Sequence, residues 1–351
     1  MGSMPRVSAV VVSFNARADL ERCLRSIADA VDEIVVVDAA SSDGGVELVR
    51  ERFPAAHVIE LAENRGFGSA MNVGVAATQG DYLLLMNPDA WAVENGVARL
   101  VECAEAEARA AVVGPRLSNP DGTLQRSVRG FPTPWRLATE YFFLRWLAPR
   151  SRVMNAFYGA GFDHRSQRRA EFLVGAVLLV RREAFVEVGG FDTDFFMFNE
   201  EVDLCYRLTR RGWSVIFCPS AEFGHVGGAS TKQVWERMYI EQLRSHLRFL
   251  TKHRGPGVAE GTRRMLVLAM RLRRLVFRGE RRRLSAAGER WLASAPATSL
   301  IAEASYSRAD GEGAVLDRDH DAEPAGDSER DGELDSARPD RSGGADRRRP
   351  K

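Results

Sequence analysis

The stretch Val7-Ser-Ala-Val-Val-Val-Ser-Phe14 decides the fold class of this chain. It is mostly apolar and rich in β-branched residues, which predicts a strand buried on both faces, as in parallel sheets. Segments with apolar residues at helical spacing separate it from three similar runs, which are Glu33–Val37, Val58–Leu61 and Tyr82–Met86. Strands that alternate with helices predict an α/β fold around a parallel sheet.

Composition limits the class of protein. The chain has 351 residues, 45% of them hydrophobic, which is enough for one large core or two smaller ones. Its net charge of +1 gives no support for a nucleic-acid partner. The longest apolar run, Phe172 to Val180, is about half as long as a membrane span, so we expect a buried strand there and no transmembrane helix.

The cysteines and the N-terminus bear on the compartment. The four cysteines lie far apart without a CxxC pair, which favours reduced thiols over a disulfide scaffold or a zinc site; they are Cys23, Cys103, Cys205 and Cys218. No signal peptide is visible, and we expect the natural start at Met4. These features predict a cytoplasmic protein.

Polar residues follow four of the predicted strands. They are Ser13 and Asn15, Asp38, Asn64, and Asn87-Pro-Asp89. Ligands of open α/β sheets bind at the carboxyl ends of the strands, so four polar ends in succession predict one shared ligand. The glycines of Asn64-Arg-Gly-Phe-Gly68 suit a close backbone approach to a diphosphate or a sugar. No Walker A pattern occurs and no GxGxxG follows the first strand, so nucleoside triphosphate hydrolysis and nicotinamide binding lack their usual support.

Three carboxylates, Glu200, Glu201 and Asp203, occupy four positions directly after the aromatic run that begins at Phe195. One interpretation is the acidic first turn of a solvated helix. The other is a site that needs a general base and a metal ligand, because carboxylates so close together do not all ionise cheaply unless a cation or open water is near. The aromatic run, and the Gly-flanked His225 further on, favour the site.

In their order, these residues resemble the family 2 glycosyltransferases of the GT-A fold, and within them the bacterial rhamnosyltransferase-like branch. The resemblance covers about Val7 to Pro256. It rests on five motifs, which are Val10-Val-Val-Ser-Phe-Asn15, Val36-Val-Asp-Ala-Ala-Ser-Ser-Asp-Gly44, Asn64-Arg-Gly-Phe-Gly-Ser-Ala-Met-Asn72, Asn87-Pro-Asp89, and Glu200-Glu-Val-Asp-Leu-Cys-Tyr-Arg207 with His225-Val-Gly-Gly-Ala-Ser-Thr231. It implies a Rossmann-like nucleotide-binding mixed sheet flanked by helices, with a C-terminal helical extension.

We expect three parts of the chain. The resemblance implies a GT-A glycosyltransferase domain over 4–256. Composition predicts a basic amphipathic helical extension over 257–306 and, because almost no large apolar residue follows, a disordered charged tail over 307–351. The arginine-rich segment 263–283 predicts one amphipathic helix. Two interpretations stay open for it, namely peripheral contact with the inner face of the plasma membrane and packing against the main domain. The aromatic-rich segment from Pro134 to Leu147 predicts a helix that lines an acceptor groove.

The resemblance also implies roles for the polar strand ends. Asp38 would contact the nucleotide base, with Ser13 and Asn15 near the ribose and base. The residues that would shape the nucleotide-sugar pocket are Asn64, Gly66, Phe67, Asn72 and Asn87.

The metal and the base follow from the same resemblance. Asp89 is the last residue of the family's Asp-x-Asp motif and would hold Mg²⁺ or Mn²⁺ on the diphosphate, with His225 as a second ligand. Asn87 stands where the family has Asp, so we expect looser metal binding, and a His with one carboxylate suits Mn²⁺ better than Mg²⁺. Where the family's catalytic Asp stands, this chain has Glu201. We expect Glu201 to be the base, with Glu200 as the alternative, and Asp203 to pair with Arg207 on the same helix.

The activity implied is that of an inverting, metal-dependent glycosyltransferase of cell-wall and polysaccharide biosynthesis. The branch implies dTDP-β-L-rhamnose as donor, and a cell-envelope glycan or polyprenyl-diphosphate-linked sugar as acceptor. Alternatives are a UDP-sugar donor, such as UDP-galactofuranose or UDP-GlcNAc, and an inactive scaffold of a glycan-assembly complex. A nucleotidyltransferase is disfavoured because no Gly-rich Arg/Lys signature follows the first strand.

Overall fold

The structure, a computed structural model, describes residues 5–148, 151–159, 161–227 and 235–302. Contacts divide the chain into two units, Met1–Arg308 and Ala309–Lys351, and every described residue belongs to the first. The predicted tail over 307–351 lies outside the described residues, as do positions 228–231 of the last motif.

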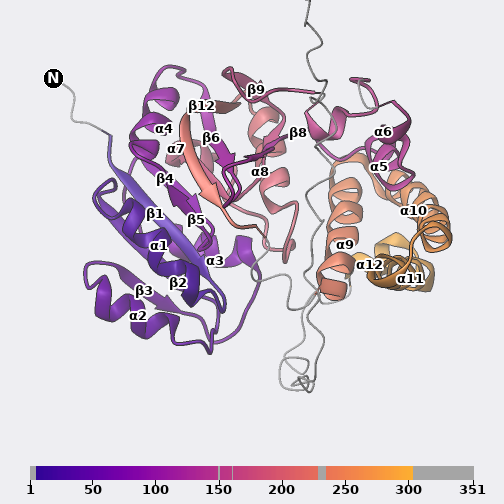
Figure 1. Ribbon diagram of the computed structural model, residues 1–351, viewed down its shortest axis with the longest axis horizontal. Helices are drawn as coiled ribbons and strands as arrows, with labels where there is room; N and C mark the ends of the chain where they lie inside the picture. The colour runs from indigo at the N-terminus through magenta and orange to yellow at the C-terminus, as the bar shows by residue number, and fades with distance from the viewer. Residues whose placement is uncertain (1–4, 149–150, 160, 228–234, 303–351) are drawn as a thin grey trace, which may run out of the picture. The chain divides into compact units, whose positions relative to one another are not determined.

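A mixed sheet forms the centre of the described chain (Figure 1). The strands are β1 (Val7–Ser13), β2 (Glu33–Asp38), β3 (His57–Glu60), β4 (Tyr82–Met86), β5 (Ala90–Ala92), β6 (Ala110–Ser118), β7 (Leu124–Gln125), β8 (Val128–Arg129), β9 (Arg168–Ala170), β10 (Phe172–Leu173), β11 (Val177–Arg181) and β12 (Ser214–His225). Their order is β3-β2-β1-β4-β11-β6-β12-β5, with β7 beside β6 and β9 beside β12, and a separate ribbon pairs β8 with β10. The neighbours among β3, β2, β1 and β4 are parallel, whereas β11 is antiparallel to both β4 and β6.

Helices cover both faces of this sheet. They are α1 (Arg17–Ile27), α2 (Gly45–Arg52), α3 (Phe67–Ala76), α4 (Gly96–Glu105), α7 (Arg182–Glu187) and α8 (Glu200–Arg210). Successive residues of β1 point to opposite faces, so that Val10 packs with Met71 of α3 and Leu204 of α8 in one cluster, and Val11 packs with Leu24 of α1 in another. Burial on both faces explains why the first strand is almost uninterruptedly apolar.

Two elements predicted as continuous are each split in two. The predicted helix from Pro134 to Leu147 is α5 (Pro134–Tyr141) followed by α6 (Leu144–Leu147), because the intervening Phe143 has φ of 59° in the left-handed region. The predicted strand from Phe172 to Val180 is β10 and β11, which pair with different partners. The three residues between them, 174–176, form the turn that faces the candidate active site.

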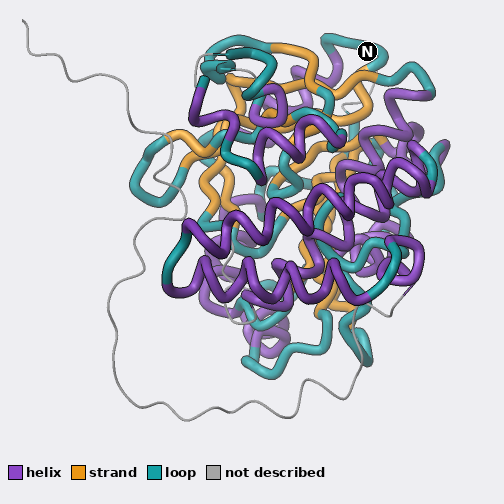
Figure 2. The backbone as a smooth tube through the Cα atoms, turned by 90° about the vertical axis from the view of Figure 1, so that its right-hand side faces the viewer, coloured by secondary structure: helices purple, strands orange, loops and turns teal. Residues whose placement is uncertain are grey.

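The predicted single helix over 263–283 is also wrong in its extent. Helix α10 (Pro256–Val276) ends before Phe277, and α11 (Gly279–Ser294) begins after Arg278, both of which have extended backbone angles. These helices, with α9 (Trp235–Arg254), α12 (Ala297–Ala302) and α5, enclose a third hydrophobic cluster that contains Leu247 and Leu266. Figure 2 brings this helical side to the front, with long helices running side by side. Helix α10 begins at the predicted domain boundary, residue 256, and packs on both α9 and α5. The separation of the chain into two parts at this position therefore stays a prediction.

The prediction of reduced cysteines is wrong for one pair. Cys103 of α4 and Cys218 of β12 form a disulfide, and their Cα atoms are 6.3 Å apart. Helix α4 packs on β12, which brings together two residues separated by 115 positions, and such a pairing has no signature in sequence spacing. Cys23 and Cys205 are free and buried.

Candidate active site

The first two polar strand ends lie side by side. Ser13 is opposite Asp38 in the β1–β2 register, and both are buried. The Ser13 hydroxyl has no hydrogen-bond partner among the described residues, while Asp38 accepts the backbone N–H of Ser41 at 2.8 Å. Asn15, with φ of 48°, joins the loops after the two strands, since its N–H donates to the Ser41 hydroxyl and its Oδ1 accepts the N–H of Ser42. The unpartnered Ser13 hydroxyl is therefore available to a ligand at this edge.

The glycine motif before α3 meets the loop before α8. Gly66 has φ of 94°, and a Cβ there would lie 2.3 Å from the Phe196 carbonyl oxygen, so only glycine fits. Its N–H donates to Asn64 Oδ1 at 3.0 Å, and the N–H of Phe67 donates to the Phe196 carbonyl at 2.9 Å. This close approach ties the motif to the segment that carries the acidic residues.

Asn72 makes a second tie between the same two segments. Its side-chain amide donates to the Phe191 carbonyl at 2.8 Å and accepts the Phe191 N–H at 2.9 Å. Both ends of the amide are thus engaged by backbone, so Asn72 acts on a ligand pocket by holding this loop in place.

Asp89 and His225 come together as a buried pair. His225 ends β12 and its Nε2 lies 3.2 Å from Asp89 Oδ1, with the Asn87 amide 3.4 Å from the same nitrogen. The His225 Nδ1–H donates to Gln125 Oε1 at 2.7 Å, which directs Nε2 towards the carboxylate. Burial acts to raise the Asp89 pKa, but hydrogen bonding to His225 and the charge of that ring outweigh it, so the pKa lies below its usual value.

This pair has the form of part of a divalent metal site. An imidazole nitrogen and a carboxylate oxygen that face each other at 3.2 Å are stable only with a proton or a cation between them. Two neighbouring ligands on an octahedral ion, each at about 2.1 Å, stand about 3 Å apart. Metal-bound histidines usually donate their other N–H to an oxygen, as His225 does to Gln125. Within the described residues no group of three such protein ligands occurs, so a ligand's own oxygens would have to complete the shell.

Glu200 and Glu201 begin α8, and each keeps a buried carboxylate oxygen that no described residue hydrogen-bonds. Burial, with the neighbouring Glu201 charge, raises the pKa of Glu200 well above its usual range. Burial also raises the pKa of Glu201, to about 7, against backbone hydrogen bonds that lower it. A Cβ at Gly175 would lie 3.4 Å from the Glu201 side chain, and the next residue, Ala176, accepts the Asn87 N–H at 2.9 Å. The 174–176 turn therefore connects the acidic pair to the Asp89–His225 pair.

Helix α9 holds the acidic segment in place through ion pairs. Asp203 is fully buried and bonds Arg207 at 2.6 Å, as predicted, and also Lys252 and His253 of α9 at 2.7 Å each. These partners overcome the effect of burial and lower the Asp203 pKa to about 2. Directly before Glu200, Asn199 has φ of 64° and its amide donates to Nδ1 of His246, whose pKa burial lowers to about 4.

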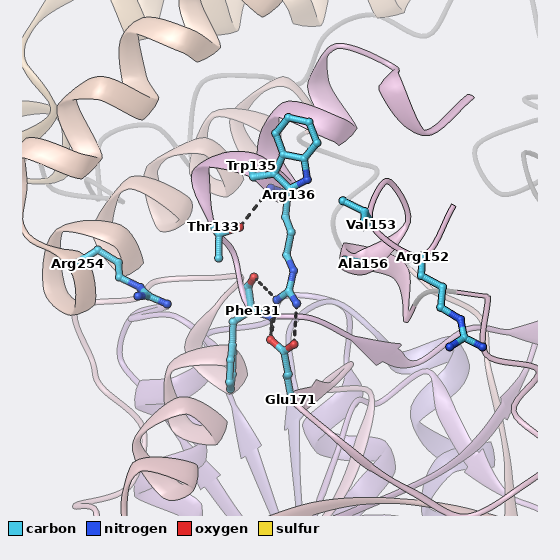
Figure 3. Close-up of a pocket in the computed structure, with 9 residues that line it drawn as sticks. All are labelled: Phe131, Thr133, Trp135, Arg136, Arg152, Val153, Ala156, Glu171 and Arg254. Carbon is cyan, nitrogen blue, oxygen red and sulfur yellow. Dashed lines mark hydrogen bonds and ion pairs between the residues drawn. The ribbon is translucent and has the colours of Figure 1, made fainter. Parts of the chain in front are cut away.

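A pocket of about 520 Å³ opens beside α5 (Figure 3). At its centre Arg136 and Glu171 form a bidentate ion pair, with both N···O distances at 2.6 Å. Arg254, the last residue of α9, lies on one side of this pair and Arg152 on the other. The predicted acceptor role for this helix remains a prediction.

Comparison with known proteins connects these features. The family model described as glycosyl transferase family 2 matches residues 8–189, and glycosyl transferase family group 2 matches residues 141–276. The chain belongs to glycosyl transferase family 2. It is 31% identical over 236 residues to the N-acetylglucosaminyl-diphospho-decaprenol L-rhamnosyltransferase of Mycobacterium tuberculosis, covering 63% of this chain and 76% of that protein. It is 25% identical over 197 residues to rhamnosyltransferase WbbL of Escherichia coli, covering 54% and 71%.

The family assignment confirms the predicted resemblance to rhamnosyltransferase-like members and, with the mixed sheet, the α/β GT-A fold. Among solved structures, a mannosyltransferase of Pyrobaculum calidifontis with GDP-mannose and Mn²⁺ is 19% identical over 85% of this chain and 79% of that one, with a TM-score of 0.47. This family 2 glycosyltransferase has, within its described residues, no helix of the length and apolar character that crossing a bilayer requires.

Several residues that the sequence did not single out hold the site of this glycosyltransferase together. Gln125 orients His225, and both Lys252 and His253 bind Asp203. His246 and His253 are seven positions apart, which places two histidines on one face of α9 and would have been a usable signal. Gln125 lies in a two-residue strand 100 positions before His225, and nothing in the local pattern marks it.

Proposed function

We propose that this chain transfers L-rhamnose from dTDP-β-L-rhamnose to a hydroxyl of a lipid-linked or cell-envelope glycan, with inversion at the anomeric carbon. The observation that carries the proposal is the pair of buried carboxylates, Glu200 and Glu201, linked through the 174–176 turn to the Asp89–His225 pair. The choice of rhamnose rests on the two rhamnosyltransferases among its relatives.

Glu201 is the general base of this proposal. With a pKa of about 7 it is part ionised at neutral pH, which suits a group that takes a proton from an attacking hydroxyl. Burial and the Glu201 charge raise the pKa of Glu200 well above its usual range, which favours its protonated form beside the base. Removal of the proton as the hydroxyl attacks the face opposite the leaving nucleotide contributes about 10²–10⁴-fold to the rate.

The nucleotide occupies the carboxyl ends of β1 and β2 in this proposal. Asp38 contacts the base, and the unpartnered Ser13 hydroxyl and the Asn15 loop contact the ribose and base. Asn64, Gly66 and Phe67 line the sugar and diphosphate side, where the glycine allows the backbone to approach closely.

Asp89 and His225 would hold Mn²⁺ or Mg²⁺, with Asn87 as a weak neighbour and Gln125 orienting the imidazole. When bound, the ion neutralises charge on the leaving diphosphate, a contribution of several kcal/mol, on the order of 3 to 5. The protein's part is to keep the carboxylate ionised and the imidazole aimed, which the lowered Asp89 pKa and the Gln125 hydrogen bond both favour.

Segment 263–283 would bring the enzyme to the surface of a membrane that carries its acceptor. Positions 271–283 contain seven arginines and one glutamate. On α10, Leu275 and Val276 are exposed beside these charges. Exposed apolar side chains flanked by cations suit an anionic lipid surface.

A donor screen tests the proposed activity. The full chain is incubated with Mn²⁺ or Mg²⁺ and a panel of nucleotide sugars, with and without N-acetylglucosaminyl-diphospho-prenol, and products are scored by mass spectrometry. We expect rhamnosylated acceptor and free dTDP from dTDP-rhamnose, and neither from the Glu201→Gln variant. Transfer only from UDP-galactofuranose or UDP-GlcNAc would keep the reaction class and reject rhamnose. Neither transfer nor nucleotide binding with any donor would instead identify a scaffold.

A further inference from the structure

The pocket beside α5 carries positive charge that no described residue balances. Arg136 is neutralised by its bidentate pair with Glu171. The side chains of Arg152 and Arg254, by contrast, have neither a hydrogen bond nor an ion pair to any described residue, although both line the cavity. Two unpaired guanidinium groups at one cavity favour a ligand with two negative charges, and their planar donors match phosphate oxygens.

Most of the remaining wall of the pocket is apolar. The ring of Phe131 and the side chains of Trp135 and Val153 line it, and the last two are 47% and 61% exposed. Apolar and aromatic side chains that line a cavity can cover an apolar part of a ligand. The ligand is therefore expected to carry a hydrocarbon part as well as its charges.

More exposed apolar side chains follow the pocket-lining Trp135 in the chain, in α6. At the far end of this segment Trp146 and Leu147 are exposed, and the ring of Phe143 lies 5.2 Å from those of both Trp146 and Phe277. Phe277 follows the exposed Leu275 and Val276 of α10. Exposed apolar side chains are thus present both at the charged pocket and beside the segment proposed to touch the membrane.

The pocket is also within reach of the base. Glu171, on the pocket wall, is four residues before Gly175, which packs against Glu201. Four extended residues span at most about 14 Å. A single sugar attached through its anomeric oxygen to a diphosphate bridges a gap of this size, with its free hydroxyl at Glu201 and its phosphates at the arginines.

We propose that this pocket binds the diphosphate of a prenyl-diphosphate-linked acceptor, with Arg152 and Arg254 on the phosphates and Trp135 and Val153 on the first isoprene units. The identity of the sugar between pocket and base rests on the proposed function, whereas the prenyl diphosphate site does not. The lipid leaves the pocket over α5 and α6 towards the membrane-facing end of α10.

Direct binding tests this site without any sugar transfer. Farnesyl diphosphate is titrated calorimetrically into the full chain, first alone and then with saturating dTDP. The test variant is Arg152→Ala with Arg254→Ala. The matched control is Arg165→Ala with Arg210→Ala, which removes two exposed guanidinium groups that no described residue binds. We expect the affinity for farnesyl diphosphate to fall at least about tenfold in the test variant and to be unchanged in the control.

The comparison probes are inorganic pyrophosphate, farnesol and phosphatidylglycerol vesicles. We expect pyrophosphate and farnesol each to bind at least about tenfold more weakly than farnesyl diphosphate, and binding to vesicles to be equal in the test and control variants. Displacement by dTDP, equal affinity for pyrophosphate, or equal loss in both variants would each overturn the proposal.

The outcome is independent of the donor screen. Rhamnose transfer without farnesyl diphosphate binding would reject the pocket and keep the proposed function. Binding that depends on the two arginines, in a chain that uses a different donor, would keep the pocket and reject rhamnose.

Discussion

Glu200 and Glu201 are neighbours in the chain, yet the proposed mechanism gives their carboxyl groups different tasks at neutral pH. Burial raises both pKa values, and Glu200 is raised further because it also meets the charge of Glu201. When the pKa values of two neighbouring acids differ in this way, one acid can act as a base while the other stays neutral. The sequence left both candidates open, and the burial of each side chain favours Glu201.

We predict that Glu201→Gln lowers kcat at least about 10²-fold, because the variant cannot accept a proton. Glu201→Asp, which restores the family's usual residue, retains a measurable part of the activity. In the wild type, kcat/KM rises with pH up to about 7 and then levels off, since the base acts only when ionised. A profile that is flat between pH 5 and pH 8 would move the base to another residue.

Glu200→Gln is the matched control for that experiment. It keeps kcat within about tenfold, because a protonated Glu200 and a glutamine are both neutral. Folding raises the Glu200 pKa, so the folded state binds a proton that the unfolded state releases, and stability falls as pH rises above the unfolded pKa. Glu200→Gln removes this loss of stability at high pH. Its Tm at pH 8 therefore exceeds that of the wild type by about 2 °C or more.

Gln125 is the second residue whose role depends on the tertiary structure. It accepts the Nδ1–H of His225 and thereby directs Nε2 towards Asp89. We predict that Gln125→Leu weakens Mn²⁺ affinity about 10–100-fold, measured by calorimetry with the bound nucleotide present. Gln79→Ala, at an exposed position, serves as control. Unchanged affinity in Gln125→Leu would show that His225 needs no such support.

At the scale of elements, the Asp203 cluster joins α8 to α9. Asp203 has no exposed side-chain surface and bonds Arg207 within α8 and Lys252 and His253 from α9. The same helix supplies Ser245, whose hydroxyl donates to the Met197 carbonyl just before the acidic residues. The position of the base thus depends on how these two helices pack.

We predict that Asp203→Asn lowers the free energy of unfolding by about 2–4 kcal/mol at pH 7, measured with urea. Folding lowers the Asp203 pKa from 3.8 to about 2, so this stabilisation is complete above the unfolded pKa and is lost as pH falls from about 4 to about 2. Asp19→Asn, which breaks an exposed pair with Arg22, changes stability by no more than about 0.5 kcal/mol. Equal effects of the two substitutions would contradict this view of α8 and α9.

Two breaks between elements were not predicted from the sequence, because the residues on both sides of each break are apolar. Phe172 to Val180 satisfies the pattern of one buried strand, but Gly175 interrupts it where the chain passes Glu201. No glycine or proline marks the break between α5 and α6, where the bulky Phe143 adopts a left-handed angle and packs against Phe277. Such conformations are set by contacts with distant residues rather than by neighbours.

At the scale of the whole molecule, the helices after residue 256 cover an apolar face of α9. The first of them, α10, ends in exposed apolar side chains. Leu247 of α9 and Leu266 of α10 are both fully buried in this third cluster. Leu275, two turns further along α10 than Leu268, is 78% exposed. One helix therefore serves the core along part of its length and offers a surface to a partner at its end.

We predict that Leu275→Glu weakens binding to phosphatidylglycerol-containing vesicles at least about tenfold in a sedimentation assay, because it removes an apolar anchor and adds a repelled charge. Val186→Glu, at a comparably open position on α7, leaves vesicle binding unchanged. Equal binding of both variants and the wild type would exclude a membrane contact through this end of α10.

The sequence by itself determined the alternating strands and helices of the first half, the polar residues at the strand ends, and the family. These depend on periodicity and composition within a few residues, which local sterics and burial impose directly. Tertiary structure alone decided that Cys103 meets Cys218, that Gln125 orients His225, that α9 holds Asp203, and that two arginines without a partner among the described residues share a pocket. Each of these joins residues from different elements, and their meeting depends on how whole helices and strands pack to bury the core.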